Sequence, residues 1–552
     1  MYLKSADALI EKYGIIFILL SGIIVYFNTL FNGFVLDDIE LIVNNPLVQN
    51  INPLKMFLGG TFYHGDATGL SGQFYRPLMM LLFSVTHGLF GAKPFFFHLL
   101  PLFFHLFNAI IVLILYRSFF PNIAAFFLAL IFLIHPVNSE TVANIAHLNE
   151  ILFVTFGLVS IFIAFNIMKF EKHVGGLLLT GLLLLSLFSK ETGILFCIII
   201  FVSYFIFKLK SRQLLISPIV ATALYLVTRV FFAKVSIFHE GVTPIMRASF
   251  EDRLFAVPKI IFFYLKTAFY PLQLITSQHL MVKQVDFVNF FLPLLLIFLV
   301  VCTLVFIWIK IKKSGEQSRQ IFLFYVLWFA AGLALHAQIL PLEYTVADRW
   351  LYFPLVGFLG IIGLSFETFG RDLKNSYRVI FLVIICLIIA AFSVRTIYRN
   401  FNWKNNLVLA THDIKSNQDS FELELLYGTE QLHLKNYQEA YTHIQKSVDL
   451  NPYWLNINNL ATVHLALGDK EKALELFRKS AYECRYFKSF ENIASINLLD
   501  GNLNDSKKAL DDGLKLYPND YKLWYILSLY YEKLGNTAEA AKAKQKYLQL
   551  KQ

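Results

Sequence analysis

The sequence predicts an all-α protein in which a polytopic bundle of membrane helices is followed by a solenoid of helical repeats. Three observations support this fold class. Of the 552 residues, 57% are apolar and only 16% are charged, whereas a soluble globular chain carries about 25% charged residues. Apolar runs with short basic connections fill the chain up to about residue 400. Beyond that point charges alternate and a helical repeat begins.

About eleven apolar segments approach the roughly 20 residues that a helix needs to cross a bilayer. They lie near residues 14–31, 95–117, 122–136, 148–168, 174–189, 191–208, 213–232, 289–310, 321–340, 350–366 and 378–396. The first reads as a retained signal anchor, because it lacks a short apolar core with a small-residue cleavage site. The segment 254–274 contains two prolines and two lysines and is expected to be a re-entrant or interfacial helix.

Basic residues favour one side of this path and orient the chain. They are Lys4, Lys12, Lys169, Lys172, Lys208, Lys210, Arg212, Lys310, Lys312, Lys313, Arg319, Arg371, Lys374 and Arg378. Because positive loops stay in the cytoplasm, the long loop 32–94 and everything after about residue 400 are expected on the other face. A full crossing by 254–274 would invert the topology downstream.

Composition also argues against several classes of partner. The net charge of +10 suggests nucleic acid, but no basic stripe is interleaved with aromatics, so no nucleic-acid partner is expected. The cysteines, Cys197, Cys302, Cys386 and Cys484, are scattered and predict neither a disulfide framework nor a metal site. His147 and Glu150 lack a matching second Glu-x-x-His segment. We therefore expect no metal and no cofactor.

The tail contains turn marks at regular intervals. Gly468, Gly501 and Gly535 are spaced by 33 and 34 residues, and Lys435 holds the equivalent place in the earliest copy. Small residues follow five positions later, at Ala440, Ala473, Ser506 and Ala540, and Pro452 and Pro518 follow second helices. The pattern resembles the tetratricopeptide repeat, whose stacked helix pairs form a solenoid with a concave surface. We predict a membrane domain over 1–400, a linker over 401–420 and about four peptide-binding repeats over 421–552.

Two adjacent carboxylates, Asp37 and Asp38, follow the first apolar segment in a short, turn-prone stretch. An ionised side chain near a bilayer costs roughly 2.5–3.5 kcal/mol on insertion scales unless it faces water, a partner or a substrate. The pair is therefore a candidate site, and it suggests acid chemistry at a membrane surface.

Five short motifs occur in order along the membrane half. They are NGFVLDD at 32–38, FYRPL at 74–78, HPVNSETVA at 135–143, SKETGI at 189–194 and DRWLYFP at 348–354. Together with the repeat tail, they resemble the transmembrane-and-tetratricopeptide O-mannosyltransferase family and its bacterial relatives, which belong to the GT-C glycosyltransferases. Asp348 stands where that family's pattern has a Glu, and the tail is short. These departures concern the sugar and the acceptor rather than the fold.

The resemblance implies an inverting transferase that moves a mannose-like hexose from a polyprenyl-phosphate donor to a hydroxyl acceptor, Ser or Thr of envelope or secreted proteins. Asp37 or Asp38 is expected to act as general base, which contributes about 10²–10⁴ in rate. Two adjacent acids cannot both ionise freely, so one has a raised pKa or holds the other in place. The sequence leaves open which acid is the base.

The leaving lipid phosphate needs a fixed cation, and Arg349 is the best candidate, with Lys190 and Arg76 next. The remaining predicted substrate-binding residues are His135, Glu140, Glu191 and Tyr352. The cations could instead extend to the membrane interface, and Lys190 could pair with Glu191. Glu140 could cap a helix or pair with a cation, and His135 could bind the backbone.

Two classes of function remain open on the sequence. One is a membrane glycosyltransferase, with an oligosaccharide ligase or polymerase as the second enzyme candidate. The other is a non-enzymatic receptor or scaffold whose repeats recruit proteins, although an anchor would need one span and no acids. The expected partners are a lipid-linked sugar, a polypeptide and membrane lipid. The composition hints at a bacterial inner-membrane protein with a periplasmic tail, or a luminal tail in the endoplasmic reticulum if eukaryotic.

Overall fold

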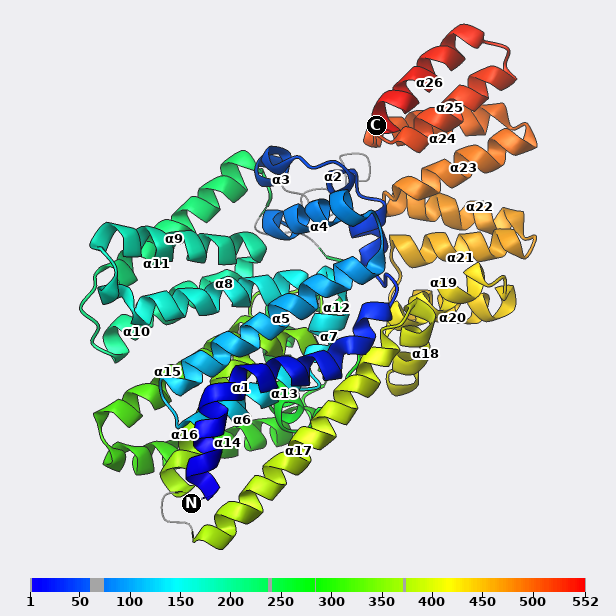
Figure 1. Ribbon diagram of the computed structural model, residues 1–552. Helices are drawn as coiled ribbons and strands as arrows, with labels where there is room; N and C mark the ends of the chain where they lie inside the picture. The colour runs from blue at the N-terminus through cyan, green and yellow to red at the C-terminus, as the bar shows by residue number, and fades with distance from the viewer. Residues whose placement is uncertain (1, 60–73, 237–240, 283, 371–373, 552) are drawn as a thin grey trace. The chain divides into compact units, whose positions relative to one another are not determined.

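The computed structural model describes residues 2–59, 74–236, 241–282, 284–370 and 374–551, and its regular structure is helical (Figure 1). Within these residues the one β pairing outside helices is a single bridge between Gln278 and Val346. The chain forms two compact units. The first contains Met1–Asp38, Ile51–Gly60 and Tyr75–Asn405, and the second contains Ile39–Asn50 and Asn406–Gln552. The predicted all-α class is confirmed.

The first unit is a bundle of helices joined by short loops. Its helices are α1 (Tyr2–Tyr26), α3 (Pro53–Gly59), α4 (Pro77–Phe90), α5 (Pro94–Arg117), α6 (Asn122–Ile134), α7 (Asn138–Ala143), α8 (Leu148–Phe165), α9 (Lys172–Ser189), α10 (Ile194–Ile206), α11 (Gln213–Val227), α12 (Pro244–Arg247), α13 (Phe250–Phe269), α14 (Leu292–Ile311), α15 (Glu316–Leu335), α16 (Tyr352–Gly370) and α17 (Asn375–Asn402). The short helix α2 (Pro46–Gln49) belongs to the second unit.

Nine helices of the described chain are long and apolar enough to cross a bilayer, namely α1, α5, α8, α9, α11, α14, α15, α16 and α17. Helices α6 and α10 coincide with two further predicted spans but have only 13 residues each. The protein is therefore an integral, multi-pass membrane protein. Helix α4, with 14 residues, lies in the segment 32–94, for which the sequence predicts a single long loop. This helix was not predicted.

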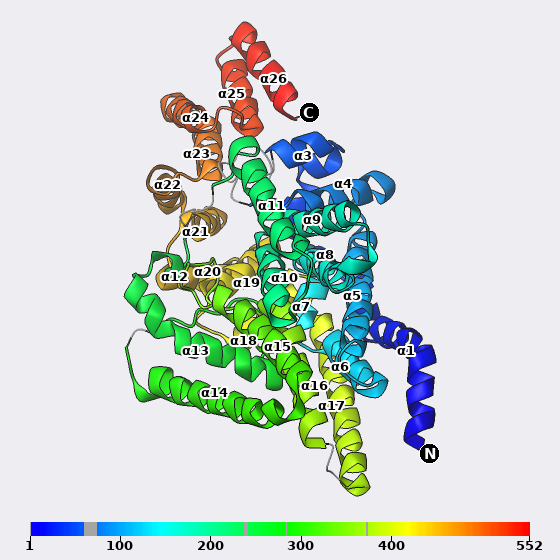
Figure 2. The same ribbon diagram turned by 90° about the vertical axis from the view of Figure 1, so that its left-hand side faces the viewer.

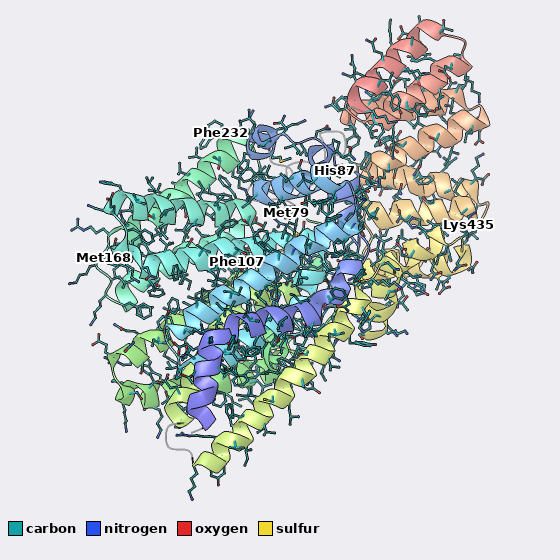
Figure 3. The ribbon with its side chains drawn as sticks, in the orientation of Figure 1. Met79, His87, Phe107, Met168, Phe232 and Lys435 are labelled. Atoms are coloured by element: carbon teal, nitrogen blue, oxygen red, sulfur yellow. The ribbon has the colours of Figure 1, made fainter. Side chains whose placement is uncertain are left out.

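Burial separates central helices from peripheral ones. In the spans that contain α8 and α16, 72% of the most apolar stretch is buried within the protein, against 6% for α14 and α17. Helices α15 and α16 approach closely at Gly357, where an added Cβ would lie 2.6 Å from the backbone nitrogen of Phe329. Small residues allow such contacts between membrane helices. Phe107 and Met168 are exposed on the unit's surface, whereas Met79 is buried (Figure 3).

Helix α13 occupies most of the segment expected to be re-entrant or interfacial. The Ser249 hydroxyl caps it by accepting from the Asp252 N–H at 3.1 Å. It packs beside α14 (Figure 2), and the Tyr264 hydroxyl on its inner face accepts from the Ala347 N–H at 3.3 Å. Helix α13 has 20 residues but is not among the nine helices of the described chain that are both long and apolar enough to cross a bilayer. Its interfacial character stays a prediction.

The second unit contains four helix pairs (Figure 1). Helix α18 (Asn406–Ser416) precedes them, within the stretch 401–420 predicted to be a linker. The pairs are α19 (Phe421–His433) with α20 (Tyr437–Leu450), α21 (Trp454–Ala466) with α22 (Lys470–Arg478), α23 (Phe487–Asp500) with α24 (Leu503–Leu516), and α25 (Tyr521–Lys533) with α26 (Thr537–Lys551).

Backbone geometry explains the repeat's turn marks. Lys435, Gly468, Gly501 and Gly535 have φ values of 64°, 90°, 80° and 72°. Each therefore sits in the left-handed region that ends a helix and that glycine adopts most readily. The small residues that follow are buried between helices, with Ala440, Ala473 and Ser506 at 0% exposure and Ala540 at 5%. The predicted solenoid of tetratricopeptide type is thus confirmed as a fold class.

Candidate active site

The first loop, residues 32–38, is fastened to neighbouring helices of the first unit. The Gly33 N–H donates to the Lys404 carbonyl at 3.0 Å, and the Asn32 side chain donates to the Asn400 carbonyl at 3.2 Å. The Gly33 carbonyl lies 3.2 Å from Nε2 of the buried His98 on α5. The loop that carries both predicted acids is therefore held in a defined position.

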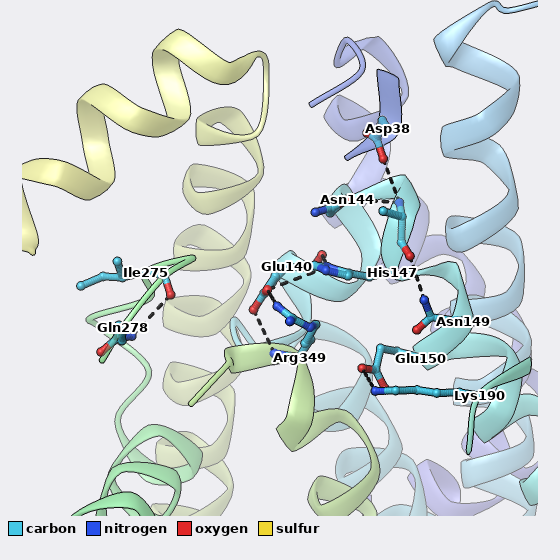
Figure 4. Close-up of polar contacts among 11 residues, drawn as sticks. Asp38, Glu140, Asn144, His147, Asn149, Glu150, Lys190, Ile275, Gln278 and Arg349 are labelled. Atoms are coloured by element: carbon cyan, nitrogen blue, oxygen red, sulfur yellow. Dashed lines mark hydrogen bonds and ion pairs between the residues drawn. The ribbon is translucent and has the colours of Figure 1, made fainter. Parts of the chain in front are cut away.

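Asp37 and Asp38 have different surroundings. Asp38 is fully buried. Its Oδ2 accepts from the Val35 N–H at 3.0 Å, and its Oδ1 accepts from the Ala146 N–H at 2.9 Å, the contact drawn in Figure 4. Asp37 is exposed. Leu36, just before them, has a φ of 52°, which is strained for a bulky residue. Such strain tends to persist where surrounding structure enforces it, often at functional sites.

The two acids also differ in their readiness to carry charge. Burial raises the pKa of the Asp38 carboxyl to about 8; hydrogen bonds from Val35 and Ala146 oppose this rise, and the charge of Asp37 adds to it. Near neutral pH Asp38 is therefore mostly protonated. The negative charge of the pair then resides on the exposed Asp37.

A buried ion pair joins Glu140 on α7 to Arg349 in the 3₁₀ turn Asp348–Leu351. Oε1 of Glu140 binds the guanidinium, and its Oε2 accepts from the Arg349 N–H at 3.0 Å (Figure 4). The Arg349 guanidinium also lies 5.0 Å from the Tyr344 ring centroid. The side chains are only 3% and 12% exposed, so Arg349 is held inside the protein rather than extended to the membrane interface.

The other two predicted cations are paired as well. Lys190 binds Glu150 (Figure 4), and Arg76 lies 3.5 Å from Glu191. Lys190 and Glu191 are adjacent in sequence, but each pairs with a residue of another element. Lys190 pairs with Glu150 on α8, and Glu191 pairs with Arg76 before α4. The structure brings together the charged residues of four motifs, each cation beside a carboxylate.

His135 and Tyr352, two further predicted substrate-binding residues, are buried and make contacts within the protein. His135 Nε2 lies 3.1 Å from the Ala268 carbonyl, and its Nδ1 accepts from the Val137 N–H at 3.3 Å. The Tyr352 hydroxyl lies 2.8 Å from His105 Nδ1 and accepts from the Asn108 amide at 3.0 Å. A role for either in substrate binding stays a prediction.

Two residues near this cluster were not predicted. His147, whose side chain is 16% exposed, has Nδ1 3.4 Å from the Glu140 carbonyl and 3.9 Å from Glu140 Oε1. Arg229, 7% exposed, lies in the π-helical turn Thr228–Phe232 after α11. The sequence contains a signal for each. His147 precedes Glu150 by three residues, a spacing that was interpreted only in terms of a metal. Arg229 is a cation inside the apolar segment 213–232, and a cation in such a segment marks a candidate site.

Among the described residues, no group of three or more His, Cys, Asp or Glu side chains is arranged to hold a metal ion.

Part of the chain is similar in sequence to known proteins. The mouse (Mus musculus) protein O-mannosyl-transferase TMTC3 is 23% identical over 471 residues, which cover 77% of this chain and 50% of that protein. The human (Homo sapiens) protein O-mannosyl-transferase TMTC1 is 34% identical over 206 residues, or 34% of this chain and 23% of that protein. The chain spans about half the length of the first of these relatives. The resemblance that the motifs indicate is thereby confirmed, although no family model matches the chain.

Solved structures that align with the chain are helical repeat proteins. The crystal structure of MamA aligns with 26% of this chain and 84% of its own, at 17% identity and a TM-score of 0.24. YrrB, described as a tetratricopeptide repeat (TPR) protein with an unusual peptide-binding site, aligns with 26% of this chain and 75% of its own, at 14% identity and a TM-score of 0.22. Scores this low carry no argument about function.

Proposed function

We propose that this chain, a relative of the transmembrane-and-tetratricopeptide O-mannosyltransferases, transfers a mannose-like hexose from a polyprenyl-phosphate donor to Ser or Thr hydroxyls of proteins. The observation that carries the proposal is an exposed carboxylate, Asp37, on a loop fixed to the same unit that buries Arg349, Lys190 and Arg76. The names of the relatives support the sugar and the protein acceptor.

Asp37 is the proposed general base. It takes the proton of the acceptor hydroxyl while the hydroxyl oxygen attacks the anomeric carbon, and the bond from that carbon to the phosphate oxygen breaks in the same step. This single displacement inverts the anomeric centre. Asp38, buried and bound to two backbone N–H groups, acts as a clamp that holds Asp37 in place. Its protonation favours ionisation of its neighbour.

The cations stabilise the leaving group. The donor is a phosphodiester with one negative charge, and the released polyprenyl phosphate carries up to two, so charge develops on phosphate oxygens as the bond breaks. Guanidinium and ammonium groups fixed in advance are effective at such positions because they need no reorganisation during the reaction. The carboxylate partners of Arg349, Lys190 and Arg76 keep these side chains oriented in the absence of donor.

The repeats are the proposed dock for the acceptor polypeptide. First helices of neighbouring pairs share a row of polar side chains: the Asn459 amide donates to Thr429 at 3.1 Å, and Asn458 Oδ1 accepts from Ser489 at 2.9 Å and Asn492 at 3.2 Å. These contacts join successive repeats into a solenoid, whose concave surface is the proposed peptide-binding face. The bias of Lys and Arg among loops supports a non-cytoplasmic location for the loop 32–38 and the repeats.

The test is a gene deletion with glycoproteomics of the envelope. Loss of the gene should remove hexose from Ser and Thr of a set of envelope or secreted proteins, and the wild-type gene should restore it. Unchanged protein glycosylation combined with loss of a surface polysaccharide would favour an oligosaccharide ligase instead. Unchanged glycans of both kinds would contradict a transferase.

A further inference from the structure

Arg229 is a buried cation that the proposed mechanism leaves unused. It is 7% exposed and follows directly from the apolar helix α11. Arg229 also lies within the apolar segment Gln213–Phe232, and a buried cation in such a segment is costly and normally faces a partner or a pathway. Arg229 therefore calls for a functional explanation.

The Arg229 guanidinium is held by uncharged groups. Its Nη1 donates to the Tyr225 hydroxyl at 3.0 Å and its Nη2 to the Ser236 carbonyl at 3.0 Å. Its Nε is buried and has no hydrogen-bond partner among the described residues. The hydrogen bonds orient the plane of the guanidinium but leave its charge uncompensated.

Neighbouring charges form the rest of the site. The charge of Arg229 acts on Glu191, which is paired with Arg76 at 3.5 Å and is also influenced by the charge of Lys190. Lys190 in turn binds Glu150. Among the described residues, Arg76 and Lys190 each pair with a carboxylate, whereas Arg229 is held by a hydroxyl and a carbonyl. A buried guanidinium held by uncharged groups favours an anionic partner.

Contacts link the two acids to the cations, and the cations to Arg229. Asp38 bonds to Ala146, the residue before His147, and the charges of Arg349, Lys190 and Arg76 act on His147. Tyr225, which binds Arg229, has its ring centroid 5.8 Å from that of Tyr75, the residue before Arg76. An in-line displacement requires the phosphate to lie opposite the attacking hydroxyl across the anomeric carbon, so the phosphate belongs at the end away from Asp37.

We propose that Arg229, together with Arg76, forms the phosphate-binding end of the donor site and holds the prenyl monophosphate product. This inference rests on the proposed function and deepens it by naming a guanidinium pair for one chemical group. Arg offers a planar fork that matches two phosphate oxygens, whereas Lys is a point charge. Glu191, paired with Arg76, keeps that arginine oriented until phosphate arrives.

The experiment compares inhibition and binding by a short-chain prenyl monophosphate and by the matching prenol, which lacks phosphate. In Arg229→Gln the inhibition constant for the monophosphate should rise about ten- to hundredfold, as expected for loss of a charged hydrogen bond, while that for the prenol stays unchanged. Arg229→Lys should fall between the two. Arg253→Gln, which alters an arginine on α13 bound to the Ala248 carbonyl, is the matched control and should behave as wild type.

Equal inhibition of wild type and Arg229→Gln by the monophosphate would overturn the inference, as would parallel changes for monophosphate and prenol, which indicate a purely structural role. If Arg229→Gln fails to fold, Arg229→Lys decides by the same ratio. If wild type transfers no sugar, the proposed function fails, and thermal stabilisation of wild type by the monophosphate, reduced in the Arg229 variants, still tests the phosphate site alone.

Discussion

The two units use charged residues in opposite ways. In the membrane unit, Glu140 with Arg349 and Glu150 with Lys190 are buried ion pairs whose side chains are at most 12% exposed. In the repeat unit, pairs such as Lys472 with Glu475 lie on the surface at helical spacing, with exposures of 44% and 66%. Burying an ion pair costs more than it returns in many proteins, whereas exposed pairs are nearly neutral. The buried pairs therefore point to function, and the exposed pairs to solubility.

Backbone conformation differs in the same sense. The repeats place glycine at three of their four left-handed turn positions, where it is least strained. The membrane unit places Leu36 in that region directly before the two acids. The loop is held in this conformation by its hydrogen bonds to α17 and to Ala146. The rigid placement of the loop that carries Asp37 and Asp38 is consistent with chemistry in the membrane unit, whereas the relaxed glycine turns are consistent with a recognition role for the repeats.

The largest expected effect is on Asp37. Asp37→Asn keeps the shape but removes the base, so the transfer rate should fall by about 10²–10⁴, with membrane insertion and melting temperature near wild type because Asp37 is exposed. The matched control is Asp511→Asn, which alters an exposed acid of the repeats and should leave the rate unchanged. Full activity in Asp37→Asn would refute its assignment as base.

Removal of residues 421–552 separates the two units by function. Repeats contact mainly their own neighbours, so the truncated chain should still bind and slowly hydrolyse the lipid-linked donor but lose transfer to its protein acceptor. Donor binding by equilibrium titration and protein labelling are the two readouts. Unchanged protein labelling would exclude the repeats as the acceptor dock, and loss of donor binding would contradict the division into units.

Stability should distinguish buried pairs from exposed ones. Glu140→Gln leaves the Arg349 guanidinium buried beside a neutral amide, and loss of one partner of a buried pair costs about 3–5 kcal/mol. Glu475→Gln should cause no measurable change. Apparent melting temperatures in detergent provide the comparison. Equal melting temperatures for both variants would mean that the membrane pairs are no more important than the surface ones.

Asp38 should also make the stability of the protein depend on pH. The folded pKa of Asp38, about 8, is above the ordinary value, so the folded state binds a proton that the unfolded state releases above about pH 4. Stability should therefore fall as pH rises from about 4 to about 8, by at most about 1.4 kcal/mol per unit, and level off above. Asp38→Asn should flatten this slope relative to wild type. A slope identical in both proteins would contradict the raised pKa.

The sequence predicted those features that a local pattern determines. The eleven predicted spans coincide with helices, because apolar length alone defines a bilayer segment. Helix α4 was missed although Pro77 at its first position and Gly91 after its end are typical helix boundaries. A local pattern could not predict which of the two acids is buried. Asp38 is buried and accepts a hydrogen bond from Ala146, which is 108 residues away in the sequence, whereas Asp37 beside it is exposed.

The pairing of charges depended on tertiary structure for the same reason. Lys190 and Glu191 are adjacent in sequence, but Lys190 adopts an extended backbone at the end of α9 and Glu191 begins a 3₁₀ turn. Their side chains therefore reach different partners, Glu150 and Arg76. The motifs predicted many of the charged residues of the candidate site but not Glu150, His147 or Arg229, and only the fold determined which of them are neighbours.

The most direct test of the central claim is a single-turnover reaction of the purified chain with prenyl-phosphate mannose and an acceptor peptide. Wild type should release one prenyl monophosphate for each mannose joined to the peptide in inverted configuration, and Asp37→Asn should bind the donor with unchanged affinity but release none. Transfer at the wild-type rate by Asp37→Asn, or mannose accepted from a nucleotide sugar but not from the lipid, would contradict the claim.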